Sequence, residues 1–328
     1  MTGPRDPKSH VVVPSEPAIG AGGAGPLVSV VIPAHDAEKT LPRALKSVLC
    51  QDGAAMEVIV VDDGSHDSTA DVARAIADAR VRVISTGQNG GAADARNQGI
   101  ARARGRYIAF LDADDEWLPD KLQAQVAAME AHPEWVLSGT DTLWVFPDGR
   151  RPRPSDPPSA GSLGAGAWRS LLANCFLNTS VAMVCTNTIR AVGGFDTALT
   201  AGEDQDMWVR LALHGPVGHV NIQGTRVHAT PGSVTRTAPR CDATYLIPMV
   251  KRHLGAQRHR LSAAEIDRIL GARYTTIGRN LYRNGDLLAG ADLLFRAMLR
   301  RHRIRENVPP VRCLKRLWHC RFWRTRAT

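Results

Sequence analysis

The sequence predicts an α/β fold in which a doubly wound, mainly parallel sheet is followed by a C-terminal helical region. The first observation is that four short runs, rich in β-branched and aliphatic residues, are nearly continuous in apolar residues instead of alternating with polar ones. Such runs are typical of strands buried on both faces of a parallel sheet. The second observation is that helix-like stretches separate the four runs. This alternation predicts right-handed crossovers and helices on both faces of the sheet.

The elements of the first half follow one another at short intervals. The expected strands are 27–33, 56–62, 81–85 and 107–112. The expected helices are 38–50, 68–78, 92–104 and 119–132. In the first of these helices, Leu41, Leu45 and Val48 lie on one face, as in an amphipathic helix.

The pattern of the second half becomes wholly helical beyond residue 240. Before that point, a stretch rich in Pro, Gly and Ser at 146–166 predicts a long loop of the functional or mobile kind. An apolar block at 180–185 precedes a helix at 203–213, whose first turn carries carboxylates that suit the helix dipole. The remaining expected helices are 241–254, 262–283 and 286–301.

Length and charge divide the 328 residues into parts. The length suits two domains, or one large domain with an appendage. Residues 251–328 hold 19 Lys and Arg against 5 Asp and Glu. Such a region can bind anionic lipid, nucleic acid or an acidic polymer, or it can be a solvated helical surface. The expected parts are a disordered leader at 1–26, an α/β domain at 27–239, a helical C-terminal region at 240–302 and a basic aromatic tail at 303–328.

Several classes of protein are disfavoured by features that the sequence lacks. It has no run of about 18 uncharged apolar residues, so we expect no membrane span. The N-terminus does not have the pattern of a secretory signal. The six cysteines show no CxxC spacing, which argues against a zinc site and against a disulfide scaffold. We therefore expect a soluble, intracellular protein with reduced thiols.

Polar loops follow all four expected strands. The loops are 33–36, 62–65, 87–91 and 112–115. Ligands of doubly wound sheets bind at the carboxyl ends of the strands. The four loops therefore predict one ligand site at a single edge of the sheet.

Two acidic pairs within these loops are candidates for distinct tasks. Asp112 and Asp114 offer hard oxygen ligands for Mg²⁺ or Mn²⁺, which would neutralise a diphosphate; the alternative is a solvated acidic loop. Asp62 and Asp63 can accept hydrogen bonds from a nucleobase or a ribose. The alternative for this pair is an Asx turn that caps the following helix.

Glycines and an arginine mark the start of the third expected helix. Free amide N–H groups at Gly90 and Gly91, together with the guanidinium of Arg96, favour a phosphate group. The alternative is an ordinary loop with a surface arginine.

Four segments of the chain resemble the inverting glycosyltransferases of family 2, which have the GT-A fold. They are VSVVIPAHDAEKTLPRALKSVLCQ, EVIVVDDGSHDST, NGGAADARNQGIARARGRYIAFLDADDEWLPDKL and GGFDTALTAGEDQDMWVRLA. The resemblance covers about residues 27–235, so the part at 27–239 is expected to be a GT-A glycosyltransferase domain. Members of this family transfer a sugar from a nucleoside diphosphate donor to an acceptor hydroxyl and invert the anomeric carbon.

The resemblance also implies site residues. Those that bind the nucleotide-sugar are Pro33, Ala34, His35, Asp36, Asp62, Asp63, Gly91, Arg96, Asp112 and Ala113. The metal, Mg²⁺ or Mn²⁺, is expected on Asp112 and Asp114, with Asp114 the direct ligand, and His228 occupies a position near the diphosphate or the metal. Relatives commonly have Tyr-Asn or Tyr-Asp where this chain has His35 and Asp36.

The family's catalytic base lies in an acidic pair before a helix, which corresponds to Glu203 and Asp204. Asp204 is the expected base, because inversion needs one carboxylate to take the proton of the attacking hydroxyl. Asp206 is assigned to helix capping.

The resulting expectation is a metal-dependent glycosyltransferase of surface polysaccharide or glycan assembly. Its partners would be a nucleoside diphosphate-sugar donor, a saccharide or lipid-linked saccharide acceptor and an anionic membrane surface at the cytoplasmic face, with no specific nucleic acid. Basic and aromatic residues of the tail favour that surface. The alternatives are a nucleotidyltransferase of similar fold and a non-catalytic binder of nucleic acid or an anionic polymer through the basic C-terminal region.

Overall fold

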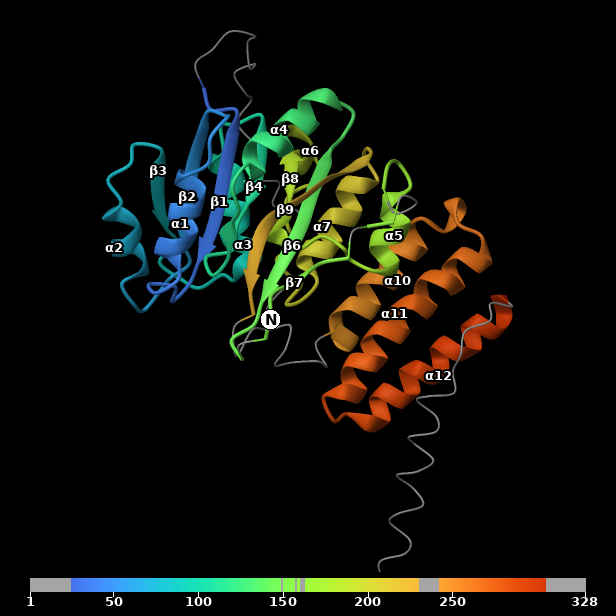
Figure 1. The fold of residues 1–328 in the computed structure, drawn as a ribbon. Helices are drawn as coiled ribbons and strands as arrows, with labels where there is room; N and C mark the ends of the chain where they lie inside the picture. Colours follow the sequence, from blue (N-terminus) through green and yellow to red (C-terminus); the bar gives the residue numbers. More distant parts are fainter. Residues whose placement is uncertain (1–24, 149, 157, 160–162, 230–241, 305–328) are drawn as a thin grey trace, which may run out of the picture.

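The computed structural model describes residues 25–304 except 149, 157, 160–162 and 230–241, and the side chains of 301–304 are not described (Figure 1). All but the last two residues of the expected leader, and nearly all of the expected tail at 303–328, lie outside the described residues. The fold is α/β, with one central sheet and a group of helices at its C-terminal end (Figure 1).

The first four strands form the parallel half of the sheet. They are β1 (Val28–Ala34), β2 (Met56–Asp62), β3 (Val81–Ser85) and β4 (Tyr107–Phe110). Strand β1 pairs in parallel with both β2 and β4, and β2 pairs in parallel with β3. All four predicted strands are confirmed. Strands β1, β2 and β4 are buried along their whole length, as their nearly continuous apolar sequences indicate, whereas β3 is partly exposed.

The second half of the sheet is mixed. Its strands are β5 (Glu116–Trp117), β6 (Leu137–Val145), β7 (Arg153–Pro154), β8 (Met183–Cys185) and β9 (Val217–His228). Strand β8 runs antiparallel to β4 and to β6, whereas β6 and β9 are parallel. The complete order is β3-β2-β1-β4-β8-β6-β9-β5, with β7 attached to β6. The expectation of a mainly parallel sheet therefore describes the half that carries the polar loops.

Apolar side chains leave both faces of the parallel half, as a doubly wound sheet requires. Val31 and Ile59 belong to the core shared with α3 (Ala92–Arg102). Val30 and Val58 belong to the core on the other face, with α1 (Leu41–Leu49). Because alternate residues of a strand point to opposite faces, each apolar run fills two cores at once.

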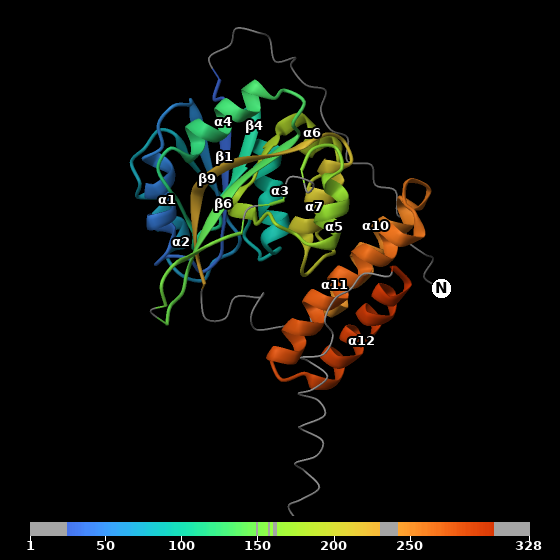
Figure 2. The same cartoon turned by 45° about the vertical axis from the view of Figure 1, so that its right-hand side comes forward.

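The other helices complete the layers and the C-terminal region. They are α2 (Thr69–Arg74), α4 (Lys121–Ala131), α5 (Ala167–Ala173), α6 (Thr186–Ala191), α7 (Glu203–Ala212), α10 (Ile247–Ala256), α11 (Ala263–Arg283) and α12 (Leu287–Ile304). Helices α11 and α12 lie side by side as a hairpin (Figure 2). Ser262 and Glu265 form a capping box at the start of α11, and Gly285, with φ of +89°, lies in the turn before α12.

Candidate active site

The polar loops after β1, β2 and β4 lie together at the carboxyl edge of the parallel strands, as predicted. Nδ1 of His35 lies 2.9 Å from the backbone carbonyl oxygen of Asp63, which links the loops after β1 and β2. Pro33, Ala34 and Ala113 are buried, so their backbones, and not their side chains, are what the edge can offer to a ligand.

Asp63 shapes the glycine loop before α3. Its buried carboxylate accepts hydrogen bonds from the backbone N–H groups of Gly90 and Gly91, at 3.0 Å and 2.7 Å, and from the hydroxyl of Thr86 at 3.2 Å. The N–H groups of Gly90 and Gly91, which were expected to be free for a phosphate, are thus satisfied within the protein. Gly91, with φ of +85°, holds the left-handed conformation that lets the loop turn toward Asp63.

Asp62 forms a local turn and does not cap the next helix. Its Oδ1 accepts a hydrogen bond from the backbone N–H of Ser65 at 3.2 Å. The first backbone N–H of α2, that of Thr69, is bound instead by Asp67 at 2.9 Å. Gly64, which lies between Asp62 and Asp67, has φ of +67°. A Cβ at this position would lie 2.8 Å from the backbone nitrogen of Asn89. Only glycine allows the loop after β2 to approach the loop after β3 so closely.

Arg96 connects two of the predicted acidic motifs. This buried side chain donates hydrogen bonds to Oδ1 of Asp112 at 2.8 Å and to Oε1 of Glu203 at 3.1 Å. Its guanidinium also lies over the ring of Phe195, 5.4 Å from the centroid. Burial works to lower the pKa of Arg96, but the charges of the two carboxylates raise it above its ordinary value. The loop after β4 and the start of α7 therefore share one permanent cation.

The loop at 112–115 concentrates negative charge. Asp115 is buried and accepts hydrogen bonds from the Ser180 hydroxyl at 2.6 Å and from the backbone N–H of His228 at 3.1 Å. Burial, and then the charges of Asp112 and Asp114, raise the pKa of Asp115 well above its usual range. Asp112, Asp114 and Asp115 place three carboxyl groups within four residues, and this donor set fits a divalent cation that takes oxygen ligands.

His228 lies beside that loop, as expected, but its imidazole is directed to a different partner. Its Nε2 is 2.9 Å from Oε1 of Glu116, which also accepts a hydrogen bond from Arg226 at 2.8 Å. Within the described ranges, Asp112, Asp114 and His228 do not form a group of ligand atoms all within 4.8 Å of one another.

Helix α7 begins with the two carboxylates assigned to the base. Glu203 is paired with Arg96, whereas Asp204 forms no ion pair with any residue that the structure describes. Oδ1 of Asp204 accepts a hydrogen bond from the backbone N–H of Gln205 at 2.6 Å. Burial, and then the charge of Glu203, raise the pKa of Asp204 to about 7. A carboxylate of this kind can exchange a proton near neutral pH.

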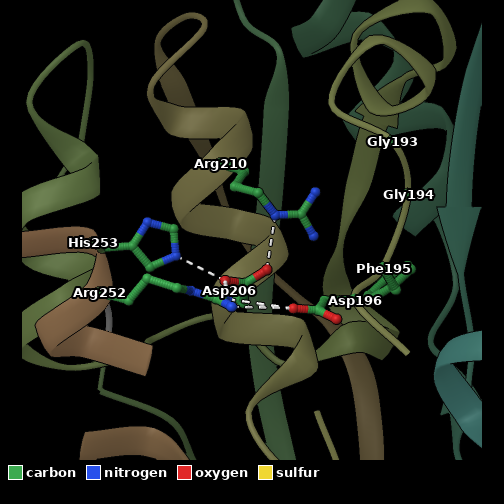
Figure 3. Close-up of a pocket in the computed structure, with 8 residues that line it drawn as sticks. All are labelled: Gly193, Gly194, Phe195, Asp196, Asp206, Arg210, Arg252 and His253. Atoms are coloured by element: carbon green, nitrogen blue, oxygen red, sulfur yellow. Dashed lines mark hydrogen bonds and ion pairs between the residues drawn. The ribbon is translucent and has the colours of Figure 1, made fainter. Parts of the chain in front are cut away.

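Asp206 is an ion-pair centre, so its assignment to helix capping alone is wrong. Its carboxylate has no exposed surface and accepts hydrogen bonds from Arg210 at 2.7 Å, Arg252 at 2.8 Å and His253 at 2.7 Å (Figure 3). Burial raises the pKa of Asp206, but the hydrogen bond from His253 and the charge of Arg210 outweigh it and lower the pKa to about 2. The sequence missed this centre because two of its partners come from α10.

These same side chains line a pocket of about 350 Å³ between α7, α10 and the loop at 193–196 (Figure 3). Asp206 follows Asp204 by two residues, which is about 200° around a helix, so the pocket and the candidate base face different ways. Its charged walls pair with one another, and the pocket is therefore a junction between helices and not the edge where the polar loops meet.

A second junction supports α7 from the C-terminal region. Nε2 of Gln205 donates a hydrogen bond to the carbonyl of Leu171 at 2.6 Å, and the buried Arg273 of α11 donates to the carbonyl of Leu172 at 3.1 Å. Both carbonyls lie in the last turn of α5, where helices leave such groups unsatisfied. The helical C-terminal region is thus packed against the elements that position Asp204.

Residues 29–169 match the sequence model of the family described as "Glycosyl transferase family 2". This part of the chain is therefore similar to a family 2 glycosyltransferase domain. The matched part of this domain contains the edge of β1, β2 and β4, whereas Glu203 and Asp204 lie beyond it.

Curated relatives match about a third of the chain. The succinoglycan biosynthesis protein ExoO of Rhizobium meliloti is 45% identical over 106 residues, which are 32% of this chain and 30% of that protein. The Escherichia coli protein WfgD, named UDP-Glc:alpha-D-GlcNAc-diphosphoundecaprenol beta-1,3-glucosyltransferase, is 41% identical over 103 residues, which are 31% of this chain and 41% of that protein. The aligned part is less than half of each relative.

Solved structures of low sequence identity share the fold of the domain. S. aureus TarS in complex with UDP has a TM-score of 0.53 and 18% identity, covering 86% of this chain and 93% of that chain. The mannosyltransferase PcManGT from Pyrobaculum calidifontis, in complex with GDP-Man and Mn²⁺, has a TM-score of 0.58 and 19% identity, covering 92% and 83%. The GT-A fold expected from the sequence is confirmed.

Proposed function

We propose that this chain is a metal-dependent, inverting glycosyltransferase of cell-surface polysaccharide or glycan biosynthesis. The observation that carries the proposal is the bridge that Arg96 makes between Asp112 and Glu203. This bridge joins the metal motif, through Asp112, to the acidic pair that contains the candidate base, through Glu203. A sugar transferred between a diphosphate and a hydroxyl needs both features within one site.

The donor is a nucleoside diphosphate-sugar held at the edge of the parallel strands. Asp62 and Asp63 lie at the part of this edge that would hold the nucleobase, and His35 and Asp36 are exposed beside them. TarS and PcManGT, which share the fold, carry UDP and GDP-Man, so this fold accommodates more than one nucleobase.

Asp114 and Asp112 would hold Mg²⁺ or Mn²⁺, because their carboxylates are oxygen ligands of the kind that a hard divalent cation takes. When bound, the ion supplies charge neutralisation for the leaving diphosphate. Arg96 stays protonated at the same place and stabilises the same developing charge without a proton transfer. His228 lies beside this loop, where its imidazole contacts Glu116.

Asp204 is the proposed general base and Glu203 its partner. Glu203 is held in place by Arg96, whereas the carboxylate of Asp204 forms no ion pair in the described part of the chain. The charge of Glu203 also keeps the proton affinity of Asp204 high, which improves its ability to take the proton of an attacking hydroxyl.

The proposed acceptor is a saccharide or a lipid-linked saccharide at the cytoplasmic face of the membrane. WfgD, which matches part of this chain, is named for a diphosphoundecaprenol-linked substrate. None of the helices that the structure describes has the length and apolarity needed to cross a bilayer. Helix α12 exposes Leu288, Phe295 and Leu299 beside arginines, as helices that lie in a membrane interface do.

The proposal is tested by transfer from UDP-, GDP- and dTDP-sugars to saccharide acceptors, with and without Mg²⁺ or Mn²⁺. The expected result is metal-dependent release of a nucleoside diphosphate that increases when the acceptor is added. Release of pyrophosphate from a nucleoside triphosphate and a sugar phosphate would instead favour the nucleotidyltransferase. Nucleic acid binding without either reaction would favour the non-catalytic alternative.

A further inference from the structure

Three side chains at the tips of the loops after β1 and β2 form a compact group of metal-ligand atoms. They belong to His35, Asp36 and His66, and one atom from each lies within 4.8 Å of the other two. Oδ2 of Asp36 is 3.5 Å from Nε2 of His35 and 3.6 Å from Nδ1 of His66. The two imidazole rings are nearly perpendicular, at 79°, with centroids 5.8 Å apart. Both nitrogens therefore approach the same carboxylate oxygen from different directions.

Two hydrogen bonds indicate which nitrogen of the His35 ring donates and which accepts. Its Nδ1 lies 2.9 Å from the Asp63 carbonyl oxygen, which can only accept, so Nδ1 carries the proton. The lone pair of the neutral ring is then on Nε2, where the Asn89 amide donates a hydrogen bond at 3.0 Å. An imidazole whose other nitrogen donates to a backbone carbonyl is the usual arrangement of a histidine that ligates a metal.

The backbone holds Asp36 in place between the two rings. Its φ of +46° lies in the left-handed region, which is unusual for a residue with a side chain. Its N–H donates a hydrogen bond to the Ser65 hydroxyl at 3.1 Å, and its Oδ1 accepts one from the His66 backbone N–H at 2.7 Å. These bonds leave Oδ2 directed at both imidazoles. The strained conformation is thus stabilised by the loop that supplies the third ligand.

We propose that His35, Asp36 and His66 bind a divalent transition-metal ion of borderline softness, with Zn²⁺ as the representative ion. Bonds of about 2.0–2.1 Å in tetrahedral geometry separate neighbouring ligand atoms by about 3.4 Å. The separations of 3.5 Å and 3.6 Å already approach that value. Two imidazole nitrogens and one carboxylate suit Zn²⁺, whereas Mg²⁺ prefers oxygen ligands, as Asp112 and Asp114 offer. The cysteine spacing could not indicate this site, because it contains no cysteine.

The site faces solvent, so an ion can enter and keep water in its remaining position. His66 is 83% exposed, and a binding ion has to displace only the Asn89 amide from Nε2 of His35. His35 also lies at the edge proposed for the nucleotide, so the ion and a nucleoside diphosphate would compete. That consequence rests on the proposed function, whereas the metal site itself does not.

The test is a calorimetric titration of the full chain with ZnCl₂ in an excess of Mg²⁺ and without nucleotide. The wild type and a His66→Ala variant are compared, with His259→Ala as the matched control, because His259 is exposed on the distant segment after α10. We expect His66→Ala to weaken the tightest zinc binding at least about tenfold, and His259→Ala to leave it unchanged. Binding through cysteines is common to all three proteins and cancels in the comparison.

Equal zinc affinity in the wild type and in His66→Ala would overturn the proposal, as would an equal loss in His259→Ala. A second titration measures UDP binding with and without Zn²⁺. Weaker UDP binding in Zn²⁺ that His66→Ala relieves would support the competition. If none of UDP, GDP and dTDP binds while zinc binding still depends on His66, the metal site stands and the proposed donor is wrong.

Discussion

Nε2 of His253 lies 2.7 Å from Oδ1 of Asp206, and this hydrogen bond joins the C-terminal helical region to α7. Helix α7 begins at Glu203, so the contact fixes the helix that presents the proposed base. Arg252 adds an ion pair to the same oxygen at 2.8 Å. The C-terminal helices are therefore part of the support of the active site.

The first prediction concerns this junction. Asp206→Asn should lower the free energy of unfolding by about 2–3 kcal/mol, because it removes the charge of a buried acceptor that three side chains share. Chemical denaturation measures the change. The matched control is Asp196→Asn, whose only ion-pair partner among the described residues is Arg252 at 3.4 Å near the surface, and its cost should stay below about 1 kcal/mol. Equal costs for the two variants would show that the buried contacts contribute nothing special.

The second prediction separates the two candidate base residues. Asp204→Asn should reduce the transfer rate by about 10²–10⁴-fold with donor affinity near that of the wild type, since the carboxylate acts mainly in the transition state. Glu203→Gln should weaken donor binding in addition to lowering the transfer rate, because it leaves Arg96 with one carboxylate partner. Steady-state kinetics and nucleotide titrations distinguish the two patterns. If Glu203→Gln loses the rate and Asp204→Asn keeps it, the base is Glu203.

The third prediction is a pH dependence of stability. The pKa of Asp204 is about 7 in the folded chain, above its ordinary value of 3.8, so the folded state binds a proton that the unfolded state has lost between these values. Stability therefore falls as pH rises from about 4 to about 7, and Asp204 is destabilising above that range. Asp204→Asn should accordingly be more stable than the wild type at pH 8, with a gap that closes toward pH 4. Metal-free melting curves across this range measure it, and a gap independent of pH would contradict the high pKa.

The parallel half of the fold was predictable because β1, β2 and β4 are buried on both faces and their sequences are nearly continuously apolar. Strands β6 and β9 were not, since Thr140, Asp141 and Gln223 interrupt any apolar run and both strands are partly exposed. Their pairing is settled by contacts between residues about 80 positions apart, which no local pattern contains.

The site divides in the same way. The sequence placed Asp112, Glu203 and Asp204 in one centre through motifs, and the structure brings the first two to a shared arginine. It did not indicate that Asp63 binds the Gly90 and Gly91 amides, because a side chain's partner depends on how two loops fold against each other. Asp206 was misassigned for the same reason.

The fourth prediction tests the proposed metal ligand. Asp114→Ala should abolish the divalent-metal dependence of nucleoside diphosphate binding and leave the fold intact, because Asp114 lies in a loop outside both apolar cores. Calorimetry with and without Mn²⁺ measures the dependence. Asp71→Ala is the matched control, since Asp71 is 83% exposed on α2, and it should bind like the wild type. An unchanged metal dependence in Asp114→Ala would remove this residue from the metal site.

The fifth prediction concerns the membrane surface and uses two independent changes. Deletion of 303–328 removes eight Lys and Arg, each of which contributes about 1 kcal/mol near an anionic bilayer, so binding to anionic vesicles should weaken strongly. Leu288→Glu places a charge on a side chain that is 88% exposed on α12, and it should weaken the same binding without changing stability. Sedimentation with anionic and neutral vesicles measures both.

The two changes differ in their response to salt, and this separates electrostatic from apolar contributions. Raising the ionic strength should weaken vesicle binding of Leu288→Glu further, because its basic tail is intact, and should matter less for the deletion. Transfer to a small soluble acceptor should be unaffected in either variant, since neither change touches the edge of β1, β2 and β4. If both variants bind vesicles as the wild type does, the basic region is a solvated surface, and the acceptor must reach Asp204 without help from the membrane.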